Sequence, residues 1–186
     1  MKLHLGSGDK RFDGFVNVDY DERCSPDIIQ DLEKKPWCFE DNSIDEVVAH
    51  HLLEHLGDPG FFIFMQELYR VCKPNALVKI VVPHHRHDVF LNDPTHRRPI
   101  TVEGLRLFSK KFNNYCIEVG DGSSKLGNYF DIDFEVVDFK FNFDSFYKPL
   151  LVDMTQEKER EIQLLIREKN NVIVDVNVTL LVVKND

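Results

Sequence analysis

The chain has 186 residues, of which 42% are hydrophobic and 30% are charged, and this length predicts one domain with a core of its own. Its formal net charge of −9 argues against long nucleic acid as a partner, because a phosphate backbone attracts basic surfaces. The four cysteines form no CxxC pair, and neither a signal peptide nor an apolar run near the ~20 residues of a membrane span is present, so we expect a cytoplasmic protein without membrane association.

Short apolar runs in the first half of the chain predict strands. They lie at 2–5, 15–18, 27–30, 44–49 and 76–83. Runs with so few polar positions are typical of parallel strands buried on both faces of a sheet. Between the last two runs, Asp58 as N-cap and Pro59 in the first turn predict a helix, which Lys73-Pro74-Asn75 ends.

The second half changes its periodicity. Residues 84–100 are polar, rich in histidine and without a clear period, which predicts a long functional loop. A short helix is expected over 101–110, irregular structure over 113–130, and a charged amphipathic helix over 155–169. A period of two over 134–143 and 172–183 predicts two long strands. Together the segments predict an α/β fold: a Rossmann-like, doubly wound, mostly parallel sheet that ends in an antiparallel strand pair and has a shortened first crossover.

A glycine loop follows the first expected strand. Gly6 and Gly8 allow a sharp turn and a close approach to a ligand, and Asp19 ends the second strand, where a carboxylate can bind two ribose hydroxyls. The dinucleotide fingerprint would also need a third glycine and a full helix. Here Lys10 stands where a further glycine could be, and the crossover is too short for that helix. A ligand without phosphate, such as S-adenosylmethionine, needs the helix N-terminus less.

Several short motifs occur together in the order of one known family. They are LGSG at 5–8, NVD at 17–19, DL at 31–32, FEDNSIDE at 39–46, LEH at 53–55, VCKPN at 71–75 and DPTH at 93–96. In this combination the chain resembles the class I S-adenosylmethionine-dependent methyltransferases, most of all their small type 11-like branch. The resemblance runs from residue 2 to about 108, with a looser match in the final strand.

The resemblance implies a cofactor site for S-adenosylmethionine. It assigns the methionine part to the loop of Gly6, Ser7 and Gly8, the ribose to Asp19, and the adenine to Asp31 and Leu32. His50 and His51 end the fourth strand, at the mouth where methyl group and acceptor meet. We expect His50 in the cofactor site and His51 among the catalytic candidates, although a solvent-facing role suits His50 equally well. Asp31 could also be a simple turn residue, and Glu54-His55 is more often structural in this family.

The histidine-rich loop leaves three interpretations open. Its imidazoles could act as a general base for a hydroxyl acceptor, with His51, His84 and His85 as candidates that the sequence does not rank. They could instead bind the acceptor by hydrogen bonds. A metal site of His84, His87, Asp88 and His96 is the third interpretation, but no zinc spacing matches, so we expect no metal.

Anion-binding side chains complete the expected acceptor site. The residues expected to bind the acceptor are Arg86, His87, His96, Arg97 and Tyr129. We therefore expect a single domain, 1–186, with a cofactor-binding half at 1–83, acceptor-side loops at 84–130 and terminal strands and a helix at 131–186. Its expected activity is methyl transfer from S-adenosylmethionine to a small molecule, with a hydroxyl of a sugar or of an anionic metabolite as the candidate acceptor. The alternatives are a non-catalytic protein that binds this cofactor and, with less support, a nicotinamide-dependent oxidoreductase. The oligomeric state is not predicted.

Overall fold

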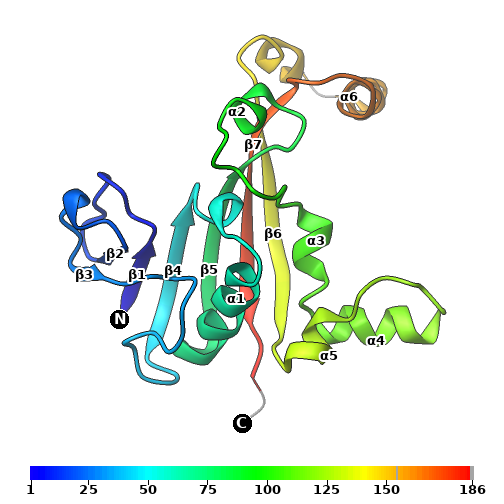
Figure 1. Ribbon diagram of the computed structural model, residues 1–186. Coiled ribbons are helices and arrows are strands. Elements are labelled where there is room, and N and C mark those ends of the chain that lie inside the picture. Colours follow the sequence, from blue (N-terminus) through cyan, green and yellow to red (C-terminus); the bar gives the residue numbers. More distant parts are fainter. Residues whose placement is uncertain (154, 185–186) are drawn as a thin grey trace.

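A seven-stranded mixed sheet forms the centre of the molecule in the computed structural model, which describes residues 1–153 and 155–184 (Figure 1). The sheet has the order β3-β2-β1-β4-β5-β7-β6, and β7 runs antiparallel to both of its neighbours. The strands are β1 (Lys2–Leu5), β2 (Val16–Asp19), β3 (Ile28–Ile29), β4 (Ile44–His50), β5 (Cys72–Pro83), β6 (Phe134–Phe143) and β7 (Ile173–Val182). The predicted Rossmann-like sheet with its antiparallel ending is confirmed.

Helices occupy the connections after β4. They are α1 (Gly60–Val71), α2 (Asp88–Leu91), α3 (Val102–Arg106), α4 (Lys110–Glu118), α5 (Leu126–Phe130) and α6 (Gln156–Glu168), with short 3-10 turns η1 (Glu22–Cys24), η2 (Leu53–His55) and η3 (Lys148–Leu151). None of the helices in the described ranges has both the length and the apolar character needed to cross a bilayer.

Two local predictions about helices were wrong. Residue 59, not Asp58, is the N-cap of α1, and the Asp58 carboxylate pairs with Arg98 instead. The segment 113–130 is largely helical rather than irregular. The helix α4 begins where the Ser109 hydroxyl accepts a hydrogen bond from the Phe112 amide at 3.1 Å. Phe112, Tyr115 and Cys116 recur in it at helical spacing, but only Asn113 and Cys116 of the helix are buried.

The hydrophobic core lies between one face of the sheet and the helices α1 and α3. Phe64, Met65 and Leu68 of α1 are fully buried and lie on one face of the helix. They share one cluster with the inward side chains of the central strands, such as Val78 and Val178. Phe134 and Val136 of β6 pack against this core. The register of β6 against β7 shifts between Val136 and Asp138, and the Val137 side chain at this irregularity is exposed.

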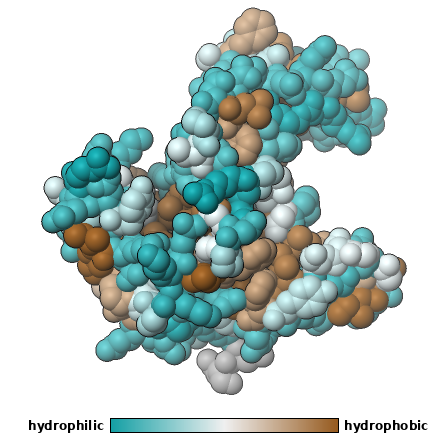
Figure 2. Space-filling model, viewed as in Figure 1, coloured by the Kyte–Doolittle hydropathy of each residue, from teal (hydrophilic) through white to brown (hydrophobic). Residues whose placement is uncertain are grey.

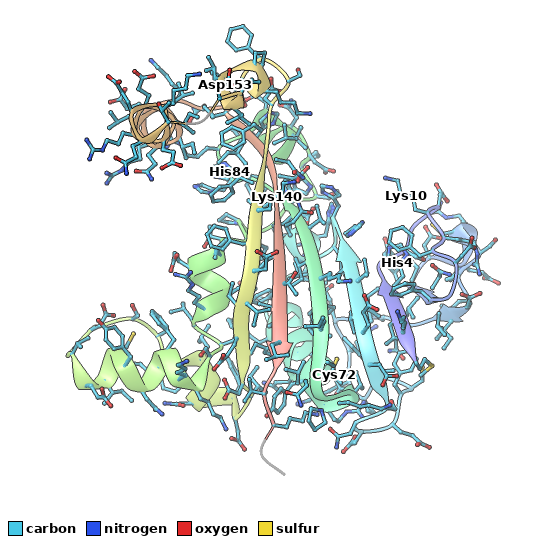
Figure 3. All side chains as sticks on the ribbon, turned by 180° about the vertical axis from the view of Figure 1, so that it is seen from behind. His4, Lys10, Cys72, His84, Lys140 and Asp153 are labelled. Atoms are coloured by element: carbon cyan, nitrogen blue, oxygen red, sulfur yellow. The ribbon has the colours of Figure 1, made fainter. Side chains whose placement is uncertain are left out.

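The opposite face of the sheet is polar, contrary to the prediction of strands buried on both faces. Glu46 lies between Lys2 and Lys79 on this face and pairs with them at 2.7 and 2.6 Å. Seen from behind, β1, β4, β5 and β7 carry no helix across them among the described residues (Figure 3). Without a helical layer to cover it, this face needs charged and polar side chains that interact well with water.

The first crossover explains part of this open face. Residues 6–15, all of them described, contain no helix and form two tight turns, closed by hydrogen bonds from Lys10 to Ser7 and from Phe15 to Phe12. The Phe12 ring stacks on His4 of β1 with a centroid distance of 4.2 Å, and His4 is 2% exposed. One aromatic ring thus covers part of the sheet where a crossover helix would otherwise pack.

Candidate functional site

One cavity of about 760 Å³ opens at the carboxyl edge of the parallel strands. Figure 2 shows the molecule hollowed on this side, between the part around β2 and β3 and the part around α2. Its lining residues are Gly6, Gly8, Asp19, Tyr20, Gln30, Asp31, Leu32, Glu33, His51, Leu52, His55, Leu56, Pro94, Thr95 and Arg97. The loops after β1, β2, β3 and β4 therefore meet in one place, together with the loop after β5, as expected for ligand binding by an open α/β sheet.

The glycine loop is held in place by Asp19. Gly6 and Gly8 have φ values of 64° and 50°, which glycine adopts without strain. The Gly8 amide donates to Asp19 Oδ2 at 2.8 Å, and the Asp21 amide donates to Asp19 Oδ1 at 2.9 Å. A Cβ atom on Gly6 would lie 2.8 Å from Leu52 Cδ1, whereas one on Gly8 would meet nothing within 4 Å. The first glycine is thus needed for packing as well as for its φ angle.

The other expected cofactor residues divide into two groups. Asp31 and Leu32 line the cavity, although the Asp31 carboxylate also accepts from the Glu33 amide at 3.0 Å and pairs with Lys34. Ser7 is 5% exposed and is not among the lining residues. The pKa of Asp31 is lowered, first by the hydrogen bond from Lys34. Asp31 therefore acts as a turn residue, as one interpretation expected. Because it also lies on the cavity wall, it is still placed to contact an adenine.

His50 and His51 are neighbours in sequence with different surroundings. The His50 ring lies on the polar face of the sheet, edge-on to the rings of His4 and Phe12, outside the cavity lining. Burial lowers the pKa of His50, and the neighbouring His4 adds to this effect. His51 has a left-handed φ of 52°, and its side chain lines the cavity. The change of backbone conformation at the strand end is what turns the second imidazole toward the cavity.

A buried carboxylate lies beside His51. His51 Nδ1 is 3.4 Å from Glu54 Oε1, and Glu54 is fully buried in η2. The Glu54 carboxylate raises the pKa of His51, while partial burial of the imidazole opposes this shift. Of the three expected catalytic histidines, His51 is the one that the structure brings to the cavity.

His84 and His85 lie elsewhere. Figure 3 shows His84 at the end of the sheet near β6 and β7, on the far side from the glycine loop that carries Lys10. Its Nδ1 accepts from the Arg86 amide at 3.3 Å, and its ring is 4.4 Å from that of His85. Burial lowers the pKa of His84 to about 4, so its imidazole is neutral at pH 7. Neither histidine lines the cavity.

Arg86 and His87 connect the loop to the C-terminal half of the chain. The Arg86 guanidinium donates to the carbonyls of Ile166 and Arg167 at the end of α6. His87 is 8% exposed and caps α2 by accepting from the Val89 amide at 3.1 Å. The Arg86 guanidinium and His87 Nδ1 are thus engaged within the protein, His87 Nε2 lies 3.6 Å from Asp144 Oδ2, and neither residue belongs to the cavity lining.

The remaining acceptor candidates are also divided. Arg97 lines the cavity, and its side chain makes no ion pair with any residue of 1–153 or 155–184. His96 lies next to the cavity residue His55, with a distance of 4.7 Å between ring centroids. Tyr129 is 68% exposed in α5 and is not part of the lining.

Several cavity residues were missed from the sequence. They are Tyr20, Gln30, Glu33, Leu52, His55, Leu56, Pro94 and Thr95. Pro94 and Thr95 could have been found, because they belong to the DPTH motif that supports the resemblance to the methyltransferase family. The sequence did not predict that the loop carrying this motif folds over η2. The Arg97 amide donates to the Glu54 carbonyl at 2.8 Å, and this contact joins two segments that are distant in the sequence.

The comparisons with known proteins agree with this geometry. A family model described as a methyltransferase domain (Methyltransf_11) matches residues 11–80, which include Asp19, Asp31, Leu32 and His51. The resemblance to class I S-adenosylmethionine-dependent methyltransferases is confirmed. The family match and the fold together support a methyltransferase with S-adenosylmethionine as its cofactor. Among curated proteins, no sequence matches the chain.

Solved structures show the same methyltransferase fold over nearly the whole chain. A S-adenosylmethionine-dependent methyltransferase from Archaeoglobus fulgidus has a TM-score of 0.64 at 20% identity, covering 97% of this chain and 85% of its own. A methyltransferase from Methanosarcina mazei has a TM-score of 0.57 at 13% identity, with 99% and 92% covered. The [4+2]-cyclase SpnF also has a TM-score of 0.57, at 14% identity, with 99% and 75% covered.

The cavity suits a molecule of the size and polarity of S-adenosylmethionine. Its volume lies within the range of ordinary small-molecule sites. The open space beside Gly8 lets a ligand approach the backbone, and the Asp19 carboxylate supplies acceptors at the end of β2. The crossover has no helix N-terminus to receive a pyrophosphate, which favours a cofactor without phosphate.

Proposed function

We propose that the protein transfers a methyl group from S-adenosylmethionine to a hydroxyl of a small acceptor, with His51 as the general base. The observation that carries this proposal is the single cavity that contains Gly6, Gly8, Asp19 and His51. An imidazole at the end of β4 stands at the carboxyl edge of the sheet, where the glycine loop also ends.

The residues of the chain would act mainly by binding and orientation. S-adenosylmethionine, when bound, supplies a methyl group that is already activated. Gly6, Gly8 and Asp19 would hold its methionine and ribose parts, and Asp31 and Leu32 its adenine. His51 would accept the proton of the acceptor hydroxyl through a ring nitrogen as that oxygen attacks, and Glu54 would stabilise the resulting imidazolium.

The cavity also supports an acceptor with negative charge. Arg97 lines the wall, is exposed and has no ion-pair partner in the described parts of the chain. A guanidinium in this state can bind a carboxylate or phosphate through two hydrogen bonds. We therefore infer a small anionic metabolite or a sugar derivative as acceptor rather than long nucleic acid. For the compartment we propose the cytoplasm, because Cys24, Cys38, Cys72 and Cys116 are all free thiols.

A second function deserves a direct test because the fold is shared with a protein of another activity. The cyclase SpnF has the same fold at a TM-score of 0.57, and a fold does not determine a reaction. A protein that binds S-adenosylmethionine without transferring its methyl group is therefore our second candidate.

A panel of small hydroxyl and amine acceptors, with mass spectrometric detection of methylated product and of S-adenosylhomocysteine, separates these functions. We expect product from at least one anionic hydroxyl acceptor. With that acceptor, His51→Asn should lower kcat by about a hundredfold while cofactor affinity changes little, because the base acts on the acceptor proton. His84→Asn is the matched control, since His84 lies outside the cavity, and it should keep normal kcat. Equal losses in both variants would contradict the role of His51.

A further inference from the structure

Three metal-binding side chains converge beside the cavity. Glu54 and His55 belong to η2, and His96 comes from the loop after β5. One potential ligand atom from each of the three lies within 4.8 Å of the others. Of the four metal ligands considered from the sequence, His96 alone belongs to this cluster. The loop that carries His96 folds over η2 and so meets Glu54 and His55.

The carboxylate in this cluster lacks hydrogen bonds. Glu54 has no exposed surface, and neither of its oxygens has a hydrogen-bond partner among residues 1–153 and 155–184. Its nearest cationic group, His51 Nδ1, is 3.4 Å from Oε1 and makes no hydrogen bond with it. A buried carboxylate in such surroundings is unfavourable unless a cation compensates for its charge.

Each of the two imidazoles uses Nδ1 in a hydrogen bond, and His96 Nε2 lies 3.8 Å from Asp93 Oδ2. His96 Nδ1 is 2.8 Å from the Phe90 carbonyl, which can only accept, so Nδ1 carries the proton. His55 Nδ1 is 2.9 Å from Thr95 Oγ1, whose own proton is donated to Asp93 Oδ1 at 2.6 Å, so His55 Nδ1 is also the donor. In each ring Nε2 retains its lone pair. Hydrogen bonds from the second nitrogen to a carbonyl or a carboxylate-linked group are characteristic of metal-binding histidines.

We propose that Glu54, His55 and His96 bind a divalent transition-metal ion of the zinc class. Two imidazoles and one carboxylate are a donor set that suits such an ion and leaves a coordination position open. Ligand atoms around tetrahedral zinc lie about 3.4 Å apart, so modest side-chain rotations would close the present spacing. His55 also lines the cavity, so an ion held there would lie at the cavity wall. The site depends on neither S-adenosylmethionine nor methyl transfer.

Metal content and cobalt binding test this proposal on the full chain. Protein purified from zinc-supplemented medium should contain about one equivalent of metal by mass spectrometry. After removal by a chelator, titration with Co²⁺ should produce visible absorption bands that saturate at the same stoichiometry. Protein that contains no stoichiometric zinc, and whose chelated form gives no cobalt spectrum, would overturn the proposal.

Matched variants locate the site. Glu54→Gln and His96→Asn should weaken Co²⁺ binding by on the order of a hundredfold, and Thr95→Val, which removes an orienting hydrogen bond, by about tenfold. His85→Asn is the control, because His85 is an exposed loop histidine outside the cluster. Unchanged binding in Glu54→Gln, or an equal loss in His85→Asn, would contradict the assignment.

A stability measurement guards against unfolded variants. Without metal, Glu54→Gln should unfold at the same or a higher temperature than the wild-type chain, because the change removes a buried charge that His51, at 3.4 Å, compensates only in part. With Zn²⁺ added, the unfolding temperature of the wild-type chain should rise, and that of Glu54→Gln should not. A metal-free Glu54→Gln protein that is clearly less stable than wild type would indicate a structural partnership with His51 and would overturn the metal assignment.

Discussion

At the scale of single residues, backbone conformation decides which side chains reach the cavity. His50 continues the alternation of β4 and lies on the polar face of the sheet, whereas His51 leaves it with a φ of 52°. Gly6, Gly8, Asp19, Asp31 and Leu32, which the motifs assign to the cofactor, all line the cavity, because they directly follow or end predicted strands. Which of two adjacent histidines turns inward depends on one backbone angle and could not be predicted from the sequence.

The two requirements on Gly6 can be separated by mutation. Gly6→Ala would combine a positive φ with a Cβ atom 2.8 Å from Leu52, and we expect a loss of about 2–3 kcal/mol in unfolding free energy. Gly120→Ala is the matched control, because its φ is 70° and its Cβ atom would meet nothing within 4 Å. It should lose about 1 kcal/mol. Urea unfolding measures both values, and equal losses would show that the contact with Leu52 does not matter.

His84 gives the molecule a specific dependence on acid. Its pKa is about 4 in the folded protein and near 6.5 when unfolded, so the unfolded chain binds more protons between these pH values. The free energy of unfolding should therefore fall as the pH drops from about 6.5 to 4, with a contribution of about 1–2 kcal/mol from this partly exposed residue. In His84→Asn, whose amide oxygen can still accept from Arg86, that part of the decline should disappear. An unchanged pH profile of urea midpoints would contradict the burial of this imidazole.

At the scale of elements, a short apolar run showed where a strand lies but not what covers it. In β1 the apolar Leu3 and Leu5 alternate with Lys2 and His4, and on the face of Lys2 the described chain provides no helix. That error concerns tertiary cover, which a local pattern does not contain.

The helix α4 was missed although the sequence carries its signal. Phe112, Tyr115 and Cys116 recur at helical spacing, as an amphipathic helix requires. Much of its apolar surface, such as Tyr115 and Ile117, stays exposed in the structure.

The stacking of Phe12 on His4 tests this account of the short crossover. Burial is the main cause that lowers the pKa of His4. Phe12→Ala should expose the imidazole and move its pKa up toward the ordinary value of 6.5, which NMR titration of the ring protons can follow. Phe15→Ala serves as control, because the Phe15 ring contacts Phe12 edge-on and leaves the stack in place. A His4 pKa that does not respond to the loss of Phe12 would contradict the covering role.

At the scale of the whole molecule, the order of the elements along the chain predicted the fold. It could not predict which distant loops lie together. Five parallel strands and a final antiparallel pairing follow from the order of the segments. The contact of the DPTH loop with η2 depends on long-range backbone hydrogen bonds, such as that from Arg97 to Glu54. It brings Thr95, Arg97 and the Glu54–His55–His96 cluster to the glycine loop's cavity.

Calorimetric titration of the purified chain tests most directly whether this cavity binds the cofactor. S-adenosylmethionine and S-adenosylhomocysteine should bind at about one equivalent each, and NAD should give no heat. Asp19→Asn should weaken both interactions by about tenfold or more, because it removes a charged acceptor for the ribose hydroxyls, while His84→Asn should bind as wild type does. No binding of either S-adenosyl compound, or binding of NAD alone, would contradict the account.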